Sequence, residues 1–161
     1  MSELILSDIT IMGPGYCVIG LEQTNAGSFH SVRPLPQWGY AWREPFRFTR
    51  GDYVETQLTP ARRPRPPHIE DRQSDGLRAT ERKLSDARLV EVLSLAEVSS
   101  SLEGLFGTDL RFDSPYGNRW VQKGEGARSV CGVCFGNINF SVYKDQEPKL
   151  CAQVVLPSNE R

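Results

Sequence analysis

The sequence predicts a mainly β protein made of two small antiparallel β-barrels with a short helical segment between them. The chain of 161 residues holds 14 glycines and 11 prolines, and both residue types interrupt helices and favour turns. Short runs rich in β-branched residues recur between turn signals, and only one central stretch has a helical period. We therefore expect a first barrel over residues 1–84, a helical connector over 85–107 and a second β region over 108–161.

The first barrel is predicted to hold four strands, over residues 4–11, 16–22, 28–33 and 53–58. The breaker cluster Gly13-Pro14-Gly15 joins the first two strands as a hairpin. Pro34 and Pro36 are expected to stop the third strand, because proline cannot donate a ladder hydrogen bond. An aromatic loop over 35–50 precedes the fourth strand. Residues 60–76 are predicted to form a proline-rich, polar excursion.

The helical period lies in the central stretch and has four apolar residues at helical spacing: Leu89, Val92, Leu93 and Ala96. Ser85 is the expected N-cap. Three consecutive serines interrupt the pattern before it resumes, which predicts two short helices or one bent helix ending near Gly104 or Gly107.

Beyond the helix, four strands are expected, over residues 119–122, 128–134, 137–143 and 149–156. In the third of these, Ile138, Phe140 and Val142 alternate with polar residues, as in a half-buried antiparallel strand. Cys131 and Cys134 are three residues apart, so they would point to opposite faces of a strand. We therefore expect the cysteines to be small buried apolar side chains that bind no metal.

No apolar run approaches the roughly 20 residues that span a bilayer, and the first residues carry acidic side chains instead of a basic leader. The four cysteines are too scattered for a secreted disulfide framework. These features predict a cytoplasmic protein without a membrane partner.

The net charge of −1 hides an uneven distribution. Residues 33–88 contain eleven arginines and one lysine against eight acidic residues, whereas the segments on both sides are acidic. Arginine binds phosphate in bidentate fashion and stacks on flat rings. A local anion site is therefore compatible with an acidic total, although the same arginines can instead pair with neighbouring carboxylates on the surface.

Six short segments, in this order, carry a resemblance to a known family: Tyr16–Gly20, Ser31–Pro34, Gly51–Glu55, Pro67–Asp71, Trp120–Val121 and Arg128–Val130. The chain resembles the dual OB-fold domain found in prokaryotic conflict and defence gene neighbourhoods. The resemblance implies two OB-like barrels that bind nucleic acid or a modified nucleotide, beside a partner effector protein. It departs from the family at Phe29–Val32, where the family has a tryptophan ahead of the Arg-Pro pair.

The residues themselves also point to single-stranded nucleic acid, because OB-type barrels combine exposed aromatic rings with cations that follow the phosphates. We expect the site to be formed by Arg33, Trp38, Tyr40, Trp42, Arg43, Arg47, Arg62, Arg63, Arg65 and His68. In the alternative interpretation, Trp42, Phe46 and Phe48 pack into the core and Trp38 closes the barrel end. The arginines of the proline-rich segment would then be a solvated loop.

His68-Ile69-Glu70-Asp71 is the only place where an imidazole and carboxylates come together in the sequence. Such a cluster can ligate a metal or transfer protons, or it can satisfy a turn after Pro67. The chain has no HxH or HExxH spacing, so no metal and no cofactor are expected. No catalytic motif is legible, which favours binding over catalysis but does not exclude an enzyme, because triads assemble in space.

Three functions follow from these observations. The first is a non-catalytic module that binds single-stranded nucleic acid or a nucleotide. The second is a protein-protein adaptor in which the aromatic loop and its arginines form the interface. The third is a small enzyme centred on His68 and Asp71. Salt dependence separates the first two, because phosphate binding weakens steeply as salt rises.

Overall fold

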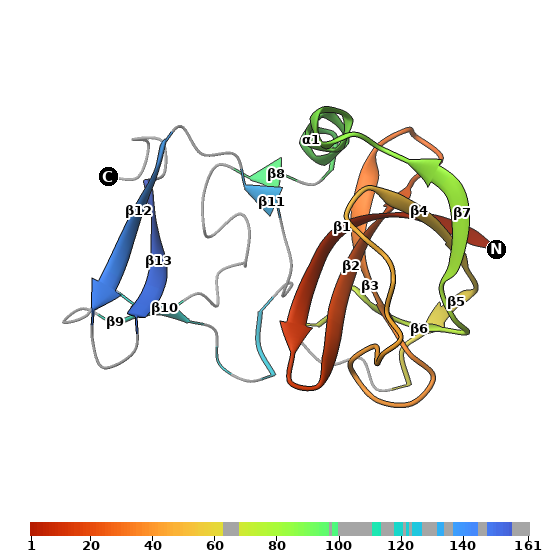
Figure 1. Ribbon diagram of the computed structural model, residues 1–161, viewed down its shortest axis with the longest axis horizontal. Coiled ribbons are helices and arrows are strands. Elements are labelled where there is room, and N and C mark those ends of the chain that lie inside the picture. The colour runs from red at the N-terminus through yellow and green to blue at the C-terminus, as the bar shows by residue number, and fades with distance from the viewer. Residues whose placement is uncertain are drawn as a thin grey trace.

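The computed structural model describes residues 1–62, 68–96, 98–99, 111–113, 118–120, 122, 124–126, 132–133, 137–144 and 148–155. This described part is mainly β and consists of a seven-stranded sheet, three two-stranded sheets and one short helix (Figure 1). None of its helices is long and apolar enough to cross a membrane. The mainly β class predicted from the sequence is therefore confirmed.

Three antiparallel strands, β1 (Ser2–Met12), β2 (Gly15–Gln23) and β3 (Phe29–Leu35), form the meander at the centre of the sheet. Gly13 makes the β1–β2 turn with a φ of 57°, a left-handed conformation that glycine adopts without steric cost. All three strands were predicted, because runs with β-branched residues lie between breaker clusters.

The third strand does not stop at Pro34, as was predicted, but ends at Leu35, directly before Pro36. Pairing with β2 ends at Val32, and β3 then pairs in parallel with another strand through Arg33, Pro34 and Leu35. The backbone N–H of Arg33 donates to the Glu70 carbonyl at 3.0 Å. Proline is tolerated here because β2 no longer needs a donor from this part of the strand.

The next four strands form one long antiparallel hairpin that is interrupted in the middle. Its base is β4 (Asp52–Thr56) against β7 (Arg78–Lys83), and its outer half is β5 (Leu58–Pro60) against β6 (Asp71–Ser74). Thr56 and Ser74 are buried at the interruption, and their hydroxyls lie 2.7 Å apart. The predicted strand over 53–58 is thus two strands that separate at Gln57.

This kinked hairpin joins the two margins of the meander, since β4 pairs with β1 and β6 pairs with β3. The strand order is β5-β6-β3-β2-β1-β4-β7, and the sheet curls into a half-barrel (Figure 1). The excursion predicted over 60–76 is corrected by this topology, because β6 lies within it. The polar residues of β6 carry no hydrophobic alternation, so periodicity could not reveal the strand.

The meander is buried on both faces. Leu4, Leu6 and Val18 belong to a cluster on one face, whereas Ile5 and Leu21 belong to a second cluster on the opposite face. Alternate residues of a strand point to opposite sides of the sheet. Aromatic residues of the loop pack against the first cluster, and the helix packs against the second.

Helix α1 (Asp86–Ser94) covers the second cluster with its buried residue Leu89. Ser85 is the N-cap as predicted, because its side chain accepts the backbone N–H of Arg88 at 3.4 Å. The predicted end near Gly104 or Gly107 lies outside the described residues. The helix ends at Ser94, before the three serines. There the Leu95 carbonyl accepts the Phe29 N–H at 3.3 Å, which returns the chain to the sheet.

Six short strands are described beyond the helix: β8 (Val98–Ser99), β9 (Arg111–Asp113), β10 (Asn118–Trp120), β11 (Gly132–Val133), β12 (Asn137–Lys144) and β13 (Pro148–Val155). The pair β12–β13 is antiparallel and confirms the last two predicted strands. β10 confirms the start of the strand predicted over 119–122, and β9 was not predicted. Most of the strand predicted over 128–134, with Cys131 and Cys134, lies outside the described residues, and the second barrel stays a prediction.

Candidate functional site

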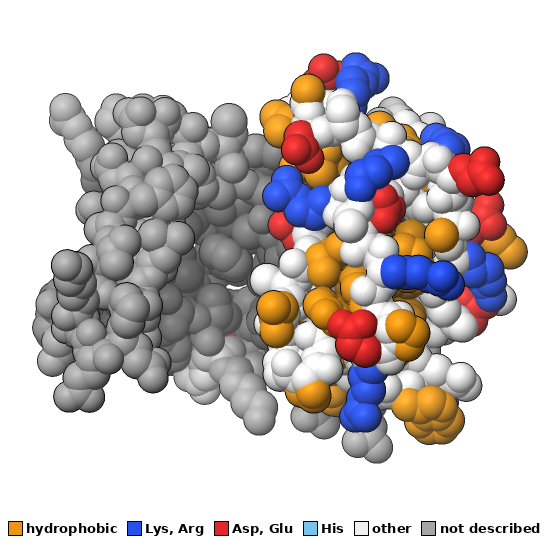
Figure 2. Space-filling view, in the orientation of Figure 1, with side chains coloured by type: hydrophobic (Ala, Val, Ile, Leu, Met, Phe, Trp, Pro, Cys, Tyr) orange, Lys and Arg blue, Asp and Glu red, His pale blue; other side chains and the backbone are white. Residues whose placement is uncertain are grey.

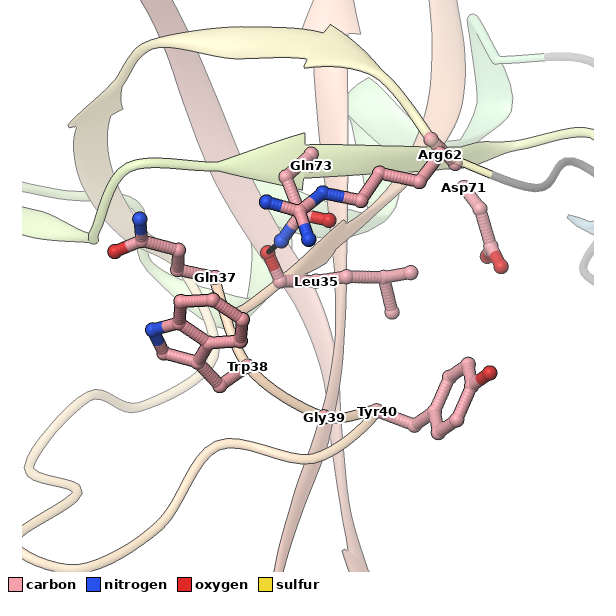
Figure 3. A pocket seen from close by; sticks show the side chains of 9 residues that line it. Leu35, Gln37, Trp38, Gly39, Tyr40, Arg62, Asp71 and Gln73 are labelled. Carbon is pink, nitrogen blue, oxygen red and sulfur yellow. Dashed lines mark hydrogen bonds between the residues drawn. The ribbon is translucent and has the colours of Figure 1, made fainter.

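Two adjoining clefts lie where the loop after β3 meets the outer half of the kinked hairpin. The first has a volume of about 350 Å³ and is lined by Leu35, Gln37, Trp38, Gly39, Tyr40, Ala61, Arg62, Asp71 and Gln73 (Figure 3). The polar and aromatic part of the lining consists of two aromatic rings, one cation, one carboxylate and two neutral amides. Three of the predicted site residues, Trp38, Tyr40 and Arg62, therefore meet in one place.

Trp38 and Tyr40 leave most of their rings open to solvent, since each is 75% exposed. Gly39 between them has a φ of 99°, a conformation that glycine adopts readily, and the rings stand on either side of it in Figure 3. Leu35 lies behind them at the end of β3 and is buried. The cleft thus offers two accessible aromatic faces, which is the geometry that base stacking requires.

Arg62 adds a positive charge to these rings. Its guanidinium carbon lies 5.3 Å from the Trp38 ring centroid, within the range of a cation–π contact. The Arg62 side chain is exposed, and it lines the second cleft as well as the first. Arg62 is therefore placed to meet an anion held at either cleft.

The second cleft continues from the first along the hairpin and has a volume of about 280 Å³. It shares Gln37, Arg62 and Gln73 with the first cleft and adds Gln57, Thr59, Pro60, Ser74 and Asp75. None of the described residues that line it is aromatic. None of these additional residues was predicted as part of a site, because they lie in a polar stretch with no motif.

The junction between loop and hairpin is fixed by Gln73. Its Nε2 atom donates to the backbone carbonyls of Leu35 at 3.2 Å and Pro36 at 2.5 Å. Two carbonyl acceptors on the same atom also identify that atom as the amide nitrogen. The aromatic loop therefore starts from a held position instead of a free end.

Arg33 is committed to an ion pair beneath the clefts. Its Nε donates to Asp71 Oδ1 at 2.5 Å and its Nη2 to Asp71 Oδ2 at 2.8 Å, and both side chains are largely buried. Burial lowers the pKa of Arg33, but the hydrogen bonds and charge of Asp71 outweigh it, so the pKa is raised. Arg33 therefore joins β3 to β6, and its charge is already neutralised by Asp71.

Trp42 packs against the core instead of opening into the clefts. Its ring lies against the first hydrophobic cluster, and its Nε1 donates to the Pro34 carbonyl at 2.9 Å. Its backbone exchanges hydrogen bonds of 2.7 and 2.9 Å with Tyr16. For Trp42, Phe46 and Phe48, which all pack against this cluster, the structure favours the core interpretation.

A second contact fixes the far half of the aromatic loop. The Tyr16 hydroxyl donates to Glu44 Oε1, and the Phe46 N–H donates to Glu44 Oε2 at 2.8 Å. The hydrogen bond and charge of Glu44 raise the pKa of Tyr16, whereas the hydrogen bonds from Tyr16 and Phe46 lower the pKa of Glu44. The Phe46 ring also stacks on Tyr16, with centroids 4.8 Å apart.

The remaining predicted arginines are divided by what the structure describes. Arg43 and Arg47 are exposed and form no ion pair with another described residue. Arg63 and Arg65 lie outside the described residues. Figure 2 shows basic and acidic side chains interspersed on the face in view, without a field of one sign. On this face, electrostatic attraction to an anion would come from individual arginines and not from a continuous basic patch.

His68, Glu70 and Asp71 come together as their spacing suggested. Each offers one ligand atom, and these atoms lie within 4.8 Å of one another, with Glu70 and Asp71 buried. Both Asp71 oxygens already accept hydrogen bonds from Arg33, which weakens the interpretation as a metal or catalytic centre. The absence of a metal stays a prediction.

Comparison with protein-family models, with curated proteins and with solved structures found no match for this chain. The function is therefore argued from the geometry and chemistry of the two clefts.

Proposed function

We propose that the protein is a non-catalytic binding module for single-stranded nucleic acid or a nucleotide, with the first cleft as its base-binding site. The observation that carries this proposal is the pair of aromatic rings, Trp38 and Tyr40, each 75% exposed beside a cleft that Arg62 also lines. Large aromatic side chains usually bury most of their surface. Two that stay open next to a cation form a surface suited to a flat, partly anionic ligand.

Base stacking supplies the main part of the proposed binding energy. A base stacked on an aromatic side chain contributes about 1–3 kcal/mol, and the contribution depends little on base identity. Because Gln73 and the buried Leu35 hold the start of the loop, Trp38 and Tyr40 need less ordering when a ligand binds. We expect two stacked bases and weak discrimination between sequences.

Phosphate contacts supply the smaller part of the proposed binding energy. Arg62, Arg43 and Arg47 are exposed and are the described arginines that we assign to phosphates. Arg63, Arg65 and His68 stay predicted contacts of the same ligand. Arg33 and Trp42 take a supporting role in this proposal, because one neutralises Asp71 and the other anchors the loop to β2.

The proposal extends to the architecture and setting that the resemblance implies. We propose OB-like barrels over residues 1–84 and 108–161, with the short helix in the connector between them. The half-barrel of β1–β7 supports the first of these barrels. A cytoplasmic location, a prokaryotic defence-type system and a partner effector protein belong to the same proposal.

The test is a titration of the full chain with single-stranded DNA, single-stranded RNA and mononucleotides. Quenching of tryptophan fluorescence reports binding. Binding is expected to weaken as salt rises, with a log–log slope set by the two or three phosphates in contact. Arg88→Gln serves as a charge-matched control, because Arg88 is exposed on α1 and pairs with Glu91. The absence of salt-sensitive binding by the folded protein overturns the proposal.

A protein-protein adaptor is the second candidate, and the same exposed rings favour it. Tryptophan, tyrosine and arginine are the residues that most often dominate binding energy in protein interfaces. A hydrophobic interface centred on Trp38 responds little to salt, whereas a phosphate-binding site responds steeply. Salt dependence therefore assigns the clefts to one function or the other.

A further inference from the structure

We propose that the second cleft holds the ribose of a nucleotide whose base stacks in the first cleft, so that the ligand is a ribonucleotide, free or within RNA, and not DNA. The inference rests on the proposed function and adds the class of sugar. It is carried by the position of the second cleft and by the hydrogen-bonding groups of Gln57, Thr59 and Asp75 that line it.

The two clefts are neighbours on the surface of the protein. Gln37, Arg62 and Gln73 line both clefts, so the two spaces adjoin along the hairpin. In a nucleotide, the sugar lies directly between base and phosphate. A base at Trp38 therefore brings its sugar toward the neighbouring space, with Arg62 in reach of the phosphate.

The lining of the second cleft suits a sugar better than a base. Its described residues include no aromatic ring on which a base could stack, and it contains the Asp75 carboxylate. The hydrogen bond from Arg78 and the backbone N–H of Gln57 lower the pKa of Asp75 to about 2. Asp75 is therefore anionic at neutral pH and can accept hydrogen bonds from hydroxyl groups.

Asp75 retains acceptor capacity for such a hydroxyl. Arg78 Nη2 donates to Oδ2 at 2.6 Å, and the Gln57 N–H donates to Oδ1 at 2.9 Å. Each carboxylate oxygen offers two lone pairs, and the Asp75 side chain is 38% exposed. Among the described residues, Oδ2 accepts from Arg78 alone, which leaves one lone pair for a ligand.

Thr59 and Gln57 complete a polar surface for a sugar. Both are exposed, and their hydroxyl and amide groups can each donate and accept. A ribose 2′-hydroxyl is also a donor and an acceptor, and it distinguishes RNA from DNA. Carboxylates recognise ribose hydroxyls in dinucleotide-binding proteins by the same chemistry. Deoxyribose lacks this 2′-hydroxyl and would make one hydrogen bond fewer to the surface.

The experiment compares RNA, DNA and 2′-O-methyl RNA of one sequence, about ten nucleotides long, in fluorescence titrations of the full chain. AMP and dAMP form a parallel pair that separates a free ribonucleotide from a strand. We expect RNA to bind about two- to tenfold more tightly than DNA, the effect of one hydrogen bond. The 2′-O-methyl strand should bind like DNA, because it lacks the donor.

Two variants test the assignment on the protein side. Thr59→Val and Gln57→Ala change exposed side chains, so folding is expected to persist, and each should reduce the RNA-to-DNA ratio of affinities. Arg88→Gln should leave the ratio unchanged. Equal affinity for RNA and DNA, with salt-sensitive binding of both, overturns the ribose assignment and leaves the proposed function intact. The proposed function itself fails if neither strand binds.

Discussion

The aromatic loop between β3 and β4 has two halves of similar composition and opposite packing. Trp38 and Tyr40 in the first half are 75% exposed, whereas Trp42, Phe46 and Phe48 in the second half pack against the hydrophobic core. Each half contains one tryptophan, and the two tryptophans are four residues apart in the sequence. Composition alone would assign them the same role.

The difference between the halves comes from their backbone partners. The backbone of Trp42 pairs with Tyr16 on β2, and Glu44 bridges the Tyr16 hydroxyl and the Phe46 N–H. These contacts bring the second half onto the sheet, where its rings bury apolar surface. Among the described residues, Trp38 and Tyr40 have no comparable backbone pairing, so their rings stay available to a ligand.

The largest expected effect that tests this comparison is on stability. Trp42→Ala should reduce the free energy of unfolding by roughly 2–4 kcal/mol, because it removes a packed ring and leaves a cavity. Trp38→Ala should change it by no more than about 0.5 kcal/mol, as for other exposed sites. Urea denaturation followed by circular dichroism measures both. Equal destabilisation by the two variants contradicts the division of the loop.

For ligand affinity, the exposed Trp38 in the first half of the loop should matter more than it does for stability. Trp38→Ala is expected to reduce oligonucleotide affinity by about 1–3 kcal/mol, since one stacking platform is lost. The slope of log affinity against log salt should hardly change, because no charge is removed. Val90→Ala, another exposed apolar position, is the matched control. An unchanged affinity for Trp38→Ala places the binding surface elsewhere.

The charge beside the rings gives a smaller but sharper signature. Arg62→Gln should flatten the salt slope by about one unit while stacking on Tyr40 persists. Fluorescence titrations at several salt concentrations measure the slope. Arg88→Gln on α1 should leave the slope as it is. An equal change in both variants would mean that net charge matters and position does not.

The smallest expected effect concerns pH and the second half of the loop. The lowered pKa of Glu44 stabilises the fold above its ordinary value of 4.5, and this contribution is lost as pH falls through the folded value. The raised pKa of Tyr16 stabilises the fold below 10.0, and this contribution is lost as pH rises through the folded value. Tyr16→Phe should lower the melting temperature by about 1–2 °C at neutral pH. It should also remove the fall in melting temperature that the wild-type protein shows as pH rises through the pKa of Tyr16. If the melting temperature of Tyr16→Phe still falls at alkaline pH, the stabilising role of the Tyr16–Glu44 hydrogen bond is contradicted.

The strands that sequence patterns predicted are rich in apolar residues. In β12 apolar residues alternate with polar ones, and β1 and β2 each have four consecutive buried residues. β6 and β7 have no such run, because β6 buries Asp71 and Ser74 through an ion pair and a hydroxyl contact, and every residue of β7 except Thr80 is exposed. Such strands exist only through partners that are distant in the chain, so local periodicity misses them.

The same distinction explains the candidate site. Exposed tryptophan and tyrosine beside arginine suggested where a ligand binds, and Trp38, Tyr40 and Arg62 do line one cleft. The sequence could not separate Trp38 from Trp42, since the backbone pairing of Tyr16 with Trp42 decides it. Nor could it find Gln57, Gln73 and Asp75, whose place beside the loop depends on the closure of the hairpin onto β3.

The kinked hairpin has a consequence for the order of folding. The β1–β3 meander needs only contacts between neighbouring strands, whereas closure requires β6 to reach Arg33 of β3 across 38 positions of the sequence. Contacts of long sequence separation form slowly, because loop entropy is lost before they stabilise the chain. Both clefts are built from the elements that meet in this late step. A ligand that binds there stabilises the closed hairpin by mass action and should slow its local opening, which hydrogen exchange at β5 and β6 would record.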